Sequence, residues 1–251
     1  MLLSFSKYEG TGNDFILIDN RKGDFPLSHA NILKLCHRRY GIGADGLILA
    51  HSSERADFSM RVFNSDGREA EMCGNGLRCF VDFLYKLNLI TKYAYIETMT
   101  KIYHCKWGAQ GIHVNMGAPK MLGNENGGTL VDTGVPHLVY FVENLRLFDE
   151  EAKIRFATLG VNINYAKLDQ HNVITLRTFE RGVEDETPSC GSGSAAACYV
   201  AFMQFGLRGS IKVKTLSGES LDFKLLEENK TLKEIHMTGR VGHVFDGEVE
   251  L

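Results

Sequence analysis

Several features that mark other classes of protein are scarce in this sequence. Its 251 residues include only four prolines, and 31 acidic side chains against 28 basic ones give a net charge of −3. This composition excludes collagen-like and low-complexity chains. Because no basic excess is present, we expect no nucleic-acid partner. No apolar stretch approaches the roughly 18 residues that a membrane-spanning helix needs, so we expect no membrane partner either.

The N-terminal segment shows no sign of a secretory leader. No basic residue precedes its short apolar patch, and no small-residue cleavage site follows it. We therefore expect a cytoplasmic protein in which the six cysteines remain thiols. The length suits one large domain or two small ones, each able to bury its own core.

The chain contains two related sets of segments. Residues 73–76 read C-G-N-G and residues 190–193 read C-G-S-G, and each motif opens an apolar stretch. The sequence GIHVNMG ending at Gly117 is echoed by EIHMTG ending at Gly239, and GNDFILID near the start resembles the later GVPHLVYFVE. Matches in the same order predict a duplicated α/β unit, with a boundary near Gly117 and Ala118.

Alternating apolar and polar residues predict short strands in both halves. The expected strands cover residues 15–19, 46–50, 58–63 and 111–116, then 129–133, 137–142, 172–179, 210–215 and 219–225. A helix is expected from Ser28 to Arg39, with Ser28 as N-cap and with Ile32, Leu35 and Cys36 on one face. Residues 194–205 are apolar nearly all round, which predicts an enclosed helix. The expected fold is α/β (α+β): two units, each a sheet wrapped around a central helix.

A C-G-x-G motif at the start of a helix favours one kind of chemistry. The first turn leaves N–H groups without helical partners, and the helix dipole adds about half a positive charge there. Such an end binds a carboxylate and stabilises a thiolate, which lowers the thiol pKa from about 8.5. Two such ends acting on one amino acid would grip its carboxylate and flank its α-carbon with Cys73 and Cys190. One thiolate would remove the α-proton while the other thiol delivered one, as in a racemase without metal or pyridoxal.

Simpler interpretations remain for many of these residues. A lone cysteine is most often a small buried hydrophobe. A zinc site at Cys73 and Cys79 does not fit, because their C-x5-C spacing falls outside the usual range and no histidine pair follows. The glycines form neither of the common nucleotide-binding motifs. By spacing alone, His137 is a core histidine and Glu180-Arg181 a surface salt bridge. The buried-hydrophobe interpretation is the one we adopt for Cys36, Cys79, Cys105 and Cys198.

The segments KYEGTGNDFILID, GADGLIL, FNSDGREAEMCGNGLRC, GVPHLV, GVNINY, ERGVEDETPSCGSGSAAA and HMTGRVGHVFDGEVEL occur in that order. In this order and over the whole chain they resemble the diaminopimelate epimerase family. The resemblance implies two pseudo-symmetric α/β units with the active site between them. Residues 1–117 with 240–251 would form the unit of Cys73, and residues 118–239 that of Cys190. It also implies cofactor-independent conversion of L,L- to meso-2,6-diaminopimelate for lysine and peptidoglycan synthesis, in a homodimer.

The resemblance also implies a role for individual residues. Cys73 and Cys190 match the acid/base pair, and Asp66 with Gly67 shapes the turn before the first of them. His137 and Glu180 match groups near the thiols, and Arg181 is a natural fork for the distant carboxylate. The expected carboxylate cradle is Gly74, Asn75, Gly191 and Ser192, and the expected substrate-holding residues are Asn13, Asn64, Asn162, Glu180 and Arg181.

Three departures from the family pattern concern the substrate. The family usually has Gln at Gly46 and Asn at Val135, and the loop at residues 182–187 is one residue longer here. The alternative is therefore a racemase of broader specificity, for example toward glutamate. More distant alternatives are the dehydratases and isomerases of the wider superfamily, which typically lack one thiol, and a binding protein that closes on an amino acid.

Overall fold

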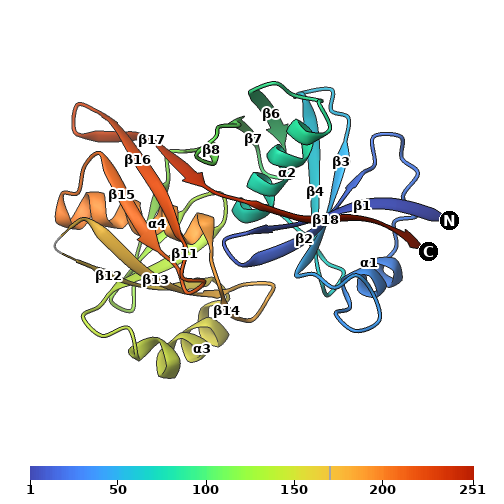
Figure 1. Ribbon diagram of the computed structural model, residues 1–251. Helices are drawn as coiled ribbons and strands as arrows, with labels where there is room; N and C mark the ends of the chain where they lie inside the picture. The colour runs from blue at the N-terminus through green and yellow to red at the C-terminus, as the bar shows by residue number, and fades with distance from the viewer. Residues whose placement is uncertain (170) are drawn as a thin grey trace. The chain divides into compact units, whose positions relative to one another are not determined.

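The computed structural model describes residues 1–169 and 171–251 (Figure 1). The chain forms two compact units, one of Met1–Val114 with Arg240–Leu251 and one of Asn115–Gly239. Among the described residues, no helix is both long and apolar enough to cross a membrane.

The first unit has helices α1 (His29–Cys36) and α2 (Gly74–Lys86), and strand β8 (Ile112–Gly117) crosses its boundary. Along the sheet, β1 pairs antiparallel with β18 and β2, β2 pairs parallel with β3, β3 antiparallel with β4, and β4 parallel with β6. The strands are β1 (Leu2–Gly10), β2 (Asn13–Asp19), β3 (Gly46–His51), β4 (Phe58–Asn64), β5 (Glu69–Ala70), β6 (Tyr93–Glu97), β7 (Ile102–Lys106) and β18 (Gly242–Glu250).

The second unit repeats this order of pairings. Strand β10 pairs antiparallel with β11, β11 parallel with β12, β12 antiparallel with β13, and β13 parallel with β15. The duplication predicted from the sequence is therefore confirmed in the topology. The elements are β9 (Lys120–Glu125), β10 (Gly128–Asp132), β11 (Pro136–Phe141), α3 (Leu147–Leu159), β12 (Asn162–Leu168), β13 (Val173–Glu180), β14 (Asp185–Thr187), α4 (Gly191–Phe205), β15 (Ser210–Lys214), β16 (Ser220–Glu228) and β17 (Thr231–Gly239).

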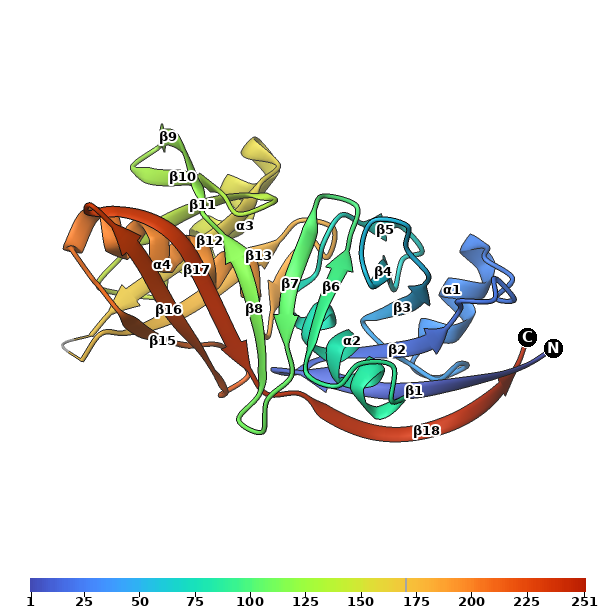
Figure 2. The same cartoon turned by 90° about the horizontal axis from the view of Figure 1, so that it is seen from above.

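One helix is central to each unit. Helix α2 contacts β1, β2, β3 and β4, and α4 contacts β10 to β13 together with β16 and β17. Figure 2 shows each of these helices among the strands of its own unit. Helix α4 is mostly buried as far as Phe202, including Ala195, Ala196 and Ala197 at 0% exposure, so the prediction of an enclosed helix is confirmed for that part. The prediction is wrong for the last turn, where Met203 is 54% and Phe205 49% exposed. Small side chains let the surrounding strands approach the first three turns closely, which is why that apolar part can be covered.

The first helix is shorter than predicted. Ser28 is its N-cap, and its hydroxyl accepts a 3.1 Å hydrogen bond from the Asn31 N–H, as expected. The helix ends at Cys36, however, because His37 adopts an extended conformation with ψ 118°. The prediction that it reached Arg39 is wrong. The segment after His37 instead turns back toward β2, where Arg38 forms ion pairs.

Helix α3 has no counterpart among the predicted elements. No side chain caps its start at Arg146, and it ends at Gly160 in the left-handed conformation, φ 64°. Tertiary contacts hold it: Phe148 and Ala152 pack in a core cluster with Tyr165. Because the helix depends on the sheet beneath it, local sequence signals are weak.

Candidate functional site

The two C-G-x-G motifs form helix N-termini of the same geometry. Cys73 caps α2 with φ −137° and ψ 112°, and Cys190 caps α4 with φ −130° and ψ 111°. Each sulfur accepts a 3.4 Å hydrogen bond from a backbone N–H three residues on, Gly76 or Gly193. Each sulfur therefore occupies the position where a helix stabilises negative charge.

Close packing explains the second glycine of each motif. A Cβ at Gly76 would lie 2.8 Å from Ile48 Cδ1, and one at Gly193 would fall against Asn164 Oδ1. A larger residue would displace the Ile48 side chain at the first position or the Asn164 amide at the second. The motif therefore fixes the sulfur in place as well as exposing backbone donors.

The other four cysteines are of a different kind. Cys36, Cys79, Cys105 and Cys198 are all buried. Burial raises the pKa of the Cys36 thiol to about 12, and burial also raises the pKa values of the Cys79, Cys105 and Cys198 thiols. Such thiols stay protonated at neutral pH and are poor nucleophiles or bases.

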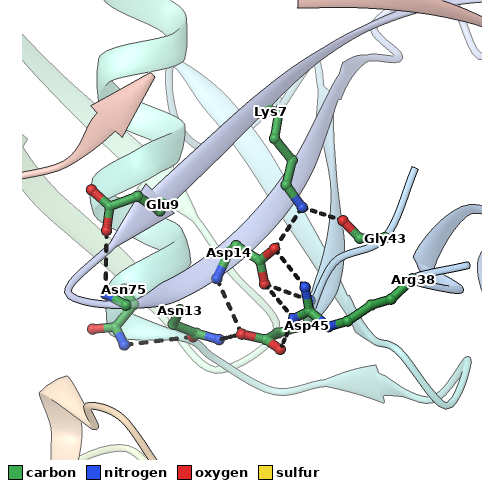
Figure 3. Close-up of polar contacts among 9 residues, drawn as sticks. Lys7, Glu9, Asn13, Asp14, Arg38, Gly43, Asp45 and Asn75 are labelled. Carbon is green, nitrogen blue, oxygen red and sulfur yellow. Dashed lines mark hydrogen bonds and ion pairs between the residues drawn. The ribbon is translucent and has the colours of Figure 1, made fainter. Parts of the chain in front are cut away.

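In the first unit, Asn13 lies between Cys73 and an acidic group. Asn13 Nδ2 donates a 2.7 Å hydrogen bond to Asp45 Oδ2, and its Oδ1 lies 3.9 Å from the Cys73 sulfur. The same oxygen accepts a 3.5 Å hydrogen bond from Asn75 Nδ2, as Figure 3 shows. Asp45 thus determines which face of the Asn13 amide points toward the thiol.

A network of charges lies behind Asp45 (Figure 3). Arg38 Nη2 is 2.6 Å from Asp45 Oδ1 and 2.7 Å from Asp14 Oδ1, and Lys7 Nζ is 2.6 Å from Asp14 Oδ2. Lys7 also donates to the carbonyl of Gly43. Burial by itself raises the pKa of Asp14, but hydrogen bonds from Arg38 and Lys7 outweigh it and hold that pKa well below its ordinary range.

Sequence reasoning missed Asp45 and also Arg78. The Arg78 side chain is fully buried, and its Nη2 donates a 2.8 Å hydrogen bond to Thr11 Oγ1. Thr11 Oγ1 in turn lies 3.4 Å from Asn75 Oδ1, which orients the Asn75 amide. The available signal was an arginine within the apolar stretch that follows Cys73, since a buried charge in a helix usually has a specific task.

Asn64 ends strand β4, directly opposite Gly46 of β3. The turn that follows is closed by a 2.9 Å hydrogen bond from the Gly67 N–H to the Asn64 carbonyl, and Gly67 has φ 86°. Asp66 accepts from the Arg68 N–H at 2.9 Å. Asp66 and Gly67 therefore form the turn before Cys73, as the resemblance implied.

In the second unit, a chain of side chains leads away from Cys190. Its sulfur lies 3.4 Å from Ser192 Oγ, which lies 3.0 Å from His137 Nε2. His137 Nδ1 in turn lies 3.1 Å from Asn164 Nδ2. His137 and Asn164 are fully buried. Burial lowers the pKa of His137 to about 3; the contact with Asn164 offsets part of this effect and the charge of Arg181 adds to it, so the imidazole is neutral at physiological pH.

The residues at the end of β13 are held by side-chain contacts. Asn162 Oδ1 accepts a 2.9 Å hydrogen bond from the Arg181 N–H, while its Nδ2 donates to the Pro136 carbonyl at 2.9 Å. Thr187 Oγ1 donates a 2.8 Å hydrogen bond to Glu180 Oε2. Asn162 therefore holds the backbone at Arg181, and Thr187 holds the carboxylate end of the Glu180 side chain.

The three departures from the family pattern have distinct settings. A Cβ at Gly46 would lie 2.6 Å from the Phe63 carbonyl oxygen, so close strand packing demands glycine there. Val135 is half-buried in the turn before β11. In the longer loop, Glu186 forms a 2.7 Å ion pair with Arg177 of β13, which attaches the loop to that strand.

The structure distributes the expected site residues over both units. The first unit holds Asn13, Asn64, Cys73, Gly74 and Asn75, and the second holds His137, Asn162, Glu180, Arg181, Cys190, Gly191 and Ser192. Among the side chains that the structure describes, no group of three or more His, Cys, Asp or Glu residues is arranged to hold a metal ion.

Comparison with known proteins identifies the family. The family described as "Diaminopimelate epimerase" matches residues 5–122 and 129–244. A diaminopimelate epimerase of Flavobacterium psychrophilum is 40% identical over 250 residues, covering 96% of this chain and 97% of the relative. This chain belongs to the diaminopimelate epimerase family. Another family member, from Chlorobaculum tepidum, is 38% identical over 258 residues, covering 96% of this chain and 99% of the relative.

Solved structures share the fold at much lower identity. A phenazine biosynthesis protein of the PhzF family from Bacillus anthracis has a TM-score of 0.76 and 18% identity, with 100% of both chains covered. A hydroxyproline epimerase from Agrobacterium vitis, solved with bound trans-4-hydroxy-L-proline, has a TM-score of 0.76 and 12% identity, covering 99% of this chain and 92% of the other. The pseudo-symmetric fold of the diaminopimelate epimerase family is therefore shared with proteins of different names.

Proposed function

We propose that this protein interconverts L,L- and meso-2,6-diaminopimelate, with Cys73 and Cys190 as the acid/base pair. The observation that carries the proposal is the matched geometry of the two thiols, each capping a helix and each accepting a backbone N–H at 3.4 Å. Among six cysteines, only these two occupy helix N-caps. The choice of diaminopimelate as the substrate rests on membership of the family.

The proposed reaction consumes neither an oxidant nor a reductant. One sulfur, as thiolate, takes the proton from the α-carbon, and the electron pair of the broken C–H bond spreads onto the adjacent carboxylate. The other sulfur, as thiol, donates its proton to the opposite face of that carbon and becomes the thiolate. Backbone N–H groups of the first turns, at Gly74, Asn75, Gly191 and Ser192, stabilise the charge that develops on the carboxylate.

The remaining residues hold the substrate away from the reacting carbon. We assign Arg181 to the distant carboxylate, because its planar guanidinium can form two parallel hydrogen bonds with it. Asn13, Asn64, Asn162 and Glu180 are assigned to the ammonium and carboxylate groups of the substrate. A homodimer, a cytoplasmic location and activity without metal or pyridoxal phosphate stay predictions.

Exchange of the α-proton with solvent tests the proposal directly. The enzyme is incubated in deuterium oxide with L,L-diaminopimelate, and in parallel with a panel of L-amino acids. We expect deuterium at the α-position of the meso product, because the delivering thiol is loaded from solvent. A binding protein would give no deuterium in any substrate, and a dehydratase or isomerase of the wider superfamily would give a product other than the epimer.

A further inference from the structure

The hydrogen bonds behind Cys190 have a direction that the side chains themselves determine. Asn164 Oδ1 accepts a 3.0 Å hydrogen bond from Thr178 Oγ1. Asn164 Nδ2 faces the carbonyls of Leu138 and Asn162, each at 3.3 Å. These contacts orient the amide, so the nitrogen, which can only donate, is the atom that faces His137 Nδ1 at 3.1 Å.

The orientation of the amide decides where His137 carries its proton. A neutral imidazole holds one proton, and a ring nitrogen that accepts from an amide cannot hold it. The proton is therefore on Nε2, which donates to Ser192 Oγ at 3.0 Å. With its oxygen accepting from His137, Ser192 directs its own hydrogen toward the Cys190 sulfur, 3.4 Å away.

Burial stabilises the direction of donation along the hydrogen-bond chain from Asn164 to Cys190. His137 and Asn164 are fully buried, and Ser192 is 7% exposed, so water does not compete for their hydrogen bonds. Arg181 is the charged group whose field acts on His137, and it favours the neutral ring. A hydrogen bond from a hydroxyl to sulfur stabilises the thiolate over the thiol, because the thiolate is the stronger acceptor.

We propose that Asn164 is a positioning residue for proton transfer at Cys190: it fixes the tautomer of His137, which turns the Ser192 hydroxyl onto the sulfur and stabilises the thiolate. His137 thus acts as a hydrogen-bond donor and not as the base that deprotonates Cys190. The catalytic meaning of this chain rests on the proposed function, whereas the tautomer and the thiolate can be measured without any substrate.

Two spectroscopic readouts test the chain. Nitrogen-15 NMR of His137 in the otherwise wild-type protein should show hydrogen on Nε2. The ultraviolet absorbance of the thiolate, followed against pH in a Cys73→Ala background, should report the titration of Cys190, since the four remaining thiols are buried with raised pKa values. Asn164→Leu should mix the two tautomers and raise the thiolate midpoint by about one pH unit, which is a roughly tenfold loss of thiolate at neutral pH.

Ser194→Ala is the matched control. Ser194 is as deeply buried as Asn164 and lies on the same helix turn as Cys190, but its hydroxyl donates at 2.7 Å to the Cys190 carbonyl, not to the sulfur. It should lower stability while it leaves the tautomer and the thiolate midpoint unchanged. An equal shift in Ser194→Ala would show that any loss of buried packing moves the midpoint, and would overturn the proposal.

Ser192→Ala keeps the test decisive where Asn164→Leu does not fold. Ser192→Ala removes only a hydroxyl group, the one that links His137 to the Cys190 sulfur. The thiolate midpoint should therefore rise as much as in Asn164→Leu, while His137 remains the Nε2 tautomer. Where both variants fold, their effects on the midpoint should not add, because they break one chain. An unmoved midpoint in Ser192→Ala, or hydrogen on Nδ1 of wild-type His137, would overturn the proposal.

Steady-state kinetics separates this proposal from the proposed function. With diaminopimelate, Asn164→Leu should lower kcat about tenfold and leave KM within about twofold, because Asn164 acts on the sulfur and does not hold substrate. A wild-type protein that epimerises diaminopimelate while the variants leave tautomer and midpoint unmoved would refute the hydrogen-bond chain alone. If the wild-type protein has no epimerase activity but the variants shift the thiolate midpoint as described, the proposed function alone would be refuted.

Discussion

Asn13 donates a 2.7 Å hydrogen bond to Asp45, and this bond leaves the carbonyl oxygen of Asn13 facing the Cys73 sulfur. In Asp45→Asn, the single side-chain oxygen at position 45 would accept from Arg38, so the amide nitrogen would face Asn13. The Asn13 amide would then have to rotate by about half a turn to present its oxygen to that nitrogen. The rotated Asn13 amide would lose its hydrogen bond to a charged group of the substrate, which is expected to raise KM roughly tenfold. Steady-state kinetics with diaminopimelate measures this.

Asp14→Asn is the control for the Asp45 variant. Asp14 shares Arg38 with Asp45 and accepts a 3.1 Å hydrogen bond from the Asp45 N–H, whereas the Asn13 side-chain amide donates to the Asp45 carboxylate. Its KM should stay within about twofold of wild type. If both variants raise KM equally, the whole charge network matters and Asp45 has no special role toward Asn13.

Both thiols are expected to be indispensable. Cys73→Ala and Cys190→Ala should each reduce interconversion of the isomers to below about 10% of wild type, because positioned acid/base groups typically contribute 10²–10⁴-fold. Chiral chromatography of the products measures this. Cys198→Ala is a suitable comparison, because Cys198 is buried within α4, the helix that Cys190 caps. This variant should retain activity if it folds. Substantial turnover in either N-cap variant would rule out a two-base reaction.

The charge network of the first unit should make stability depend on acid pH. The folded pKa of Asp14 lies below its unfolded value of about 3.9, so its contribution is present at pH 7 and is lost as pH falls below about 4. Asp14→Asn should lower the free energy of unfolding by about 1.5–3 kcal/mol at pH 7, since it removes hydrogen bonds to charged groups. Urea unfolding at pH 7 and pH 3 should show the difference between wild type and variant shrinking at the lower pH. A difference independent of pH would contradict the assignment.

Substrate specificity should depend on Val135 more than on Gly46. Val135 already carries a branched side chain, so Asn at this position adds no new Cβ, whereas a Cβ at Gly46 would lie 2.6 Å from a carbonyl oxygen. Without a polar group at 135, we expect slow racemisation of L-glutamate beside rapid epimerisation of diaminopimelate. Val135→Asn should then favour diaminopimelate at the expense of glutamate. Chiral chromatography after long incubation decides this, and an absence of D-glutamate while diaminopimelate equilibrates would exclude relaxed specificity.

Gly46→Gln provides the contrast. It restores the residue usual in the family but places a side chain against Phe63 and Phe15. We expect it to lower stability by about 1–3 kcal/mol through overpacking, with little change in the ratio of the two activities. A stable variant with improved selectivity for diaminopimelate would show that β3 and β4 can separate to admit the side chain.

The sequence by itself determined the duplication, the strands with strict alternation, and the two N-caps. These depend on neighbours a few residues apart: a thiol three residues before a glycine N–H, Ser28 three residues before Asn31, apolar side chains at period two. Local geometry is enough to make such features, so local pattern is enough to predict them.

Only the tertiary structure decided which polar groups stand behind each thiol. Asp45 reaches Asn13, Thr178 reaches Asn164 and Arg78 reaches Thr11 because strands and helices distant in the chain pack together. The early end of α1 has the same cause, since Arg38 is drawn to two carboxylates. Helix α3 likewise exists through its packing on the sheet. Hydrogen-bond partners across a core leave no periodic trace in sequence, because each depends on a single side chain meeting another at about 3 Å.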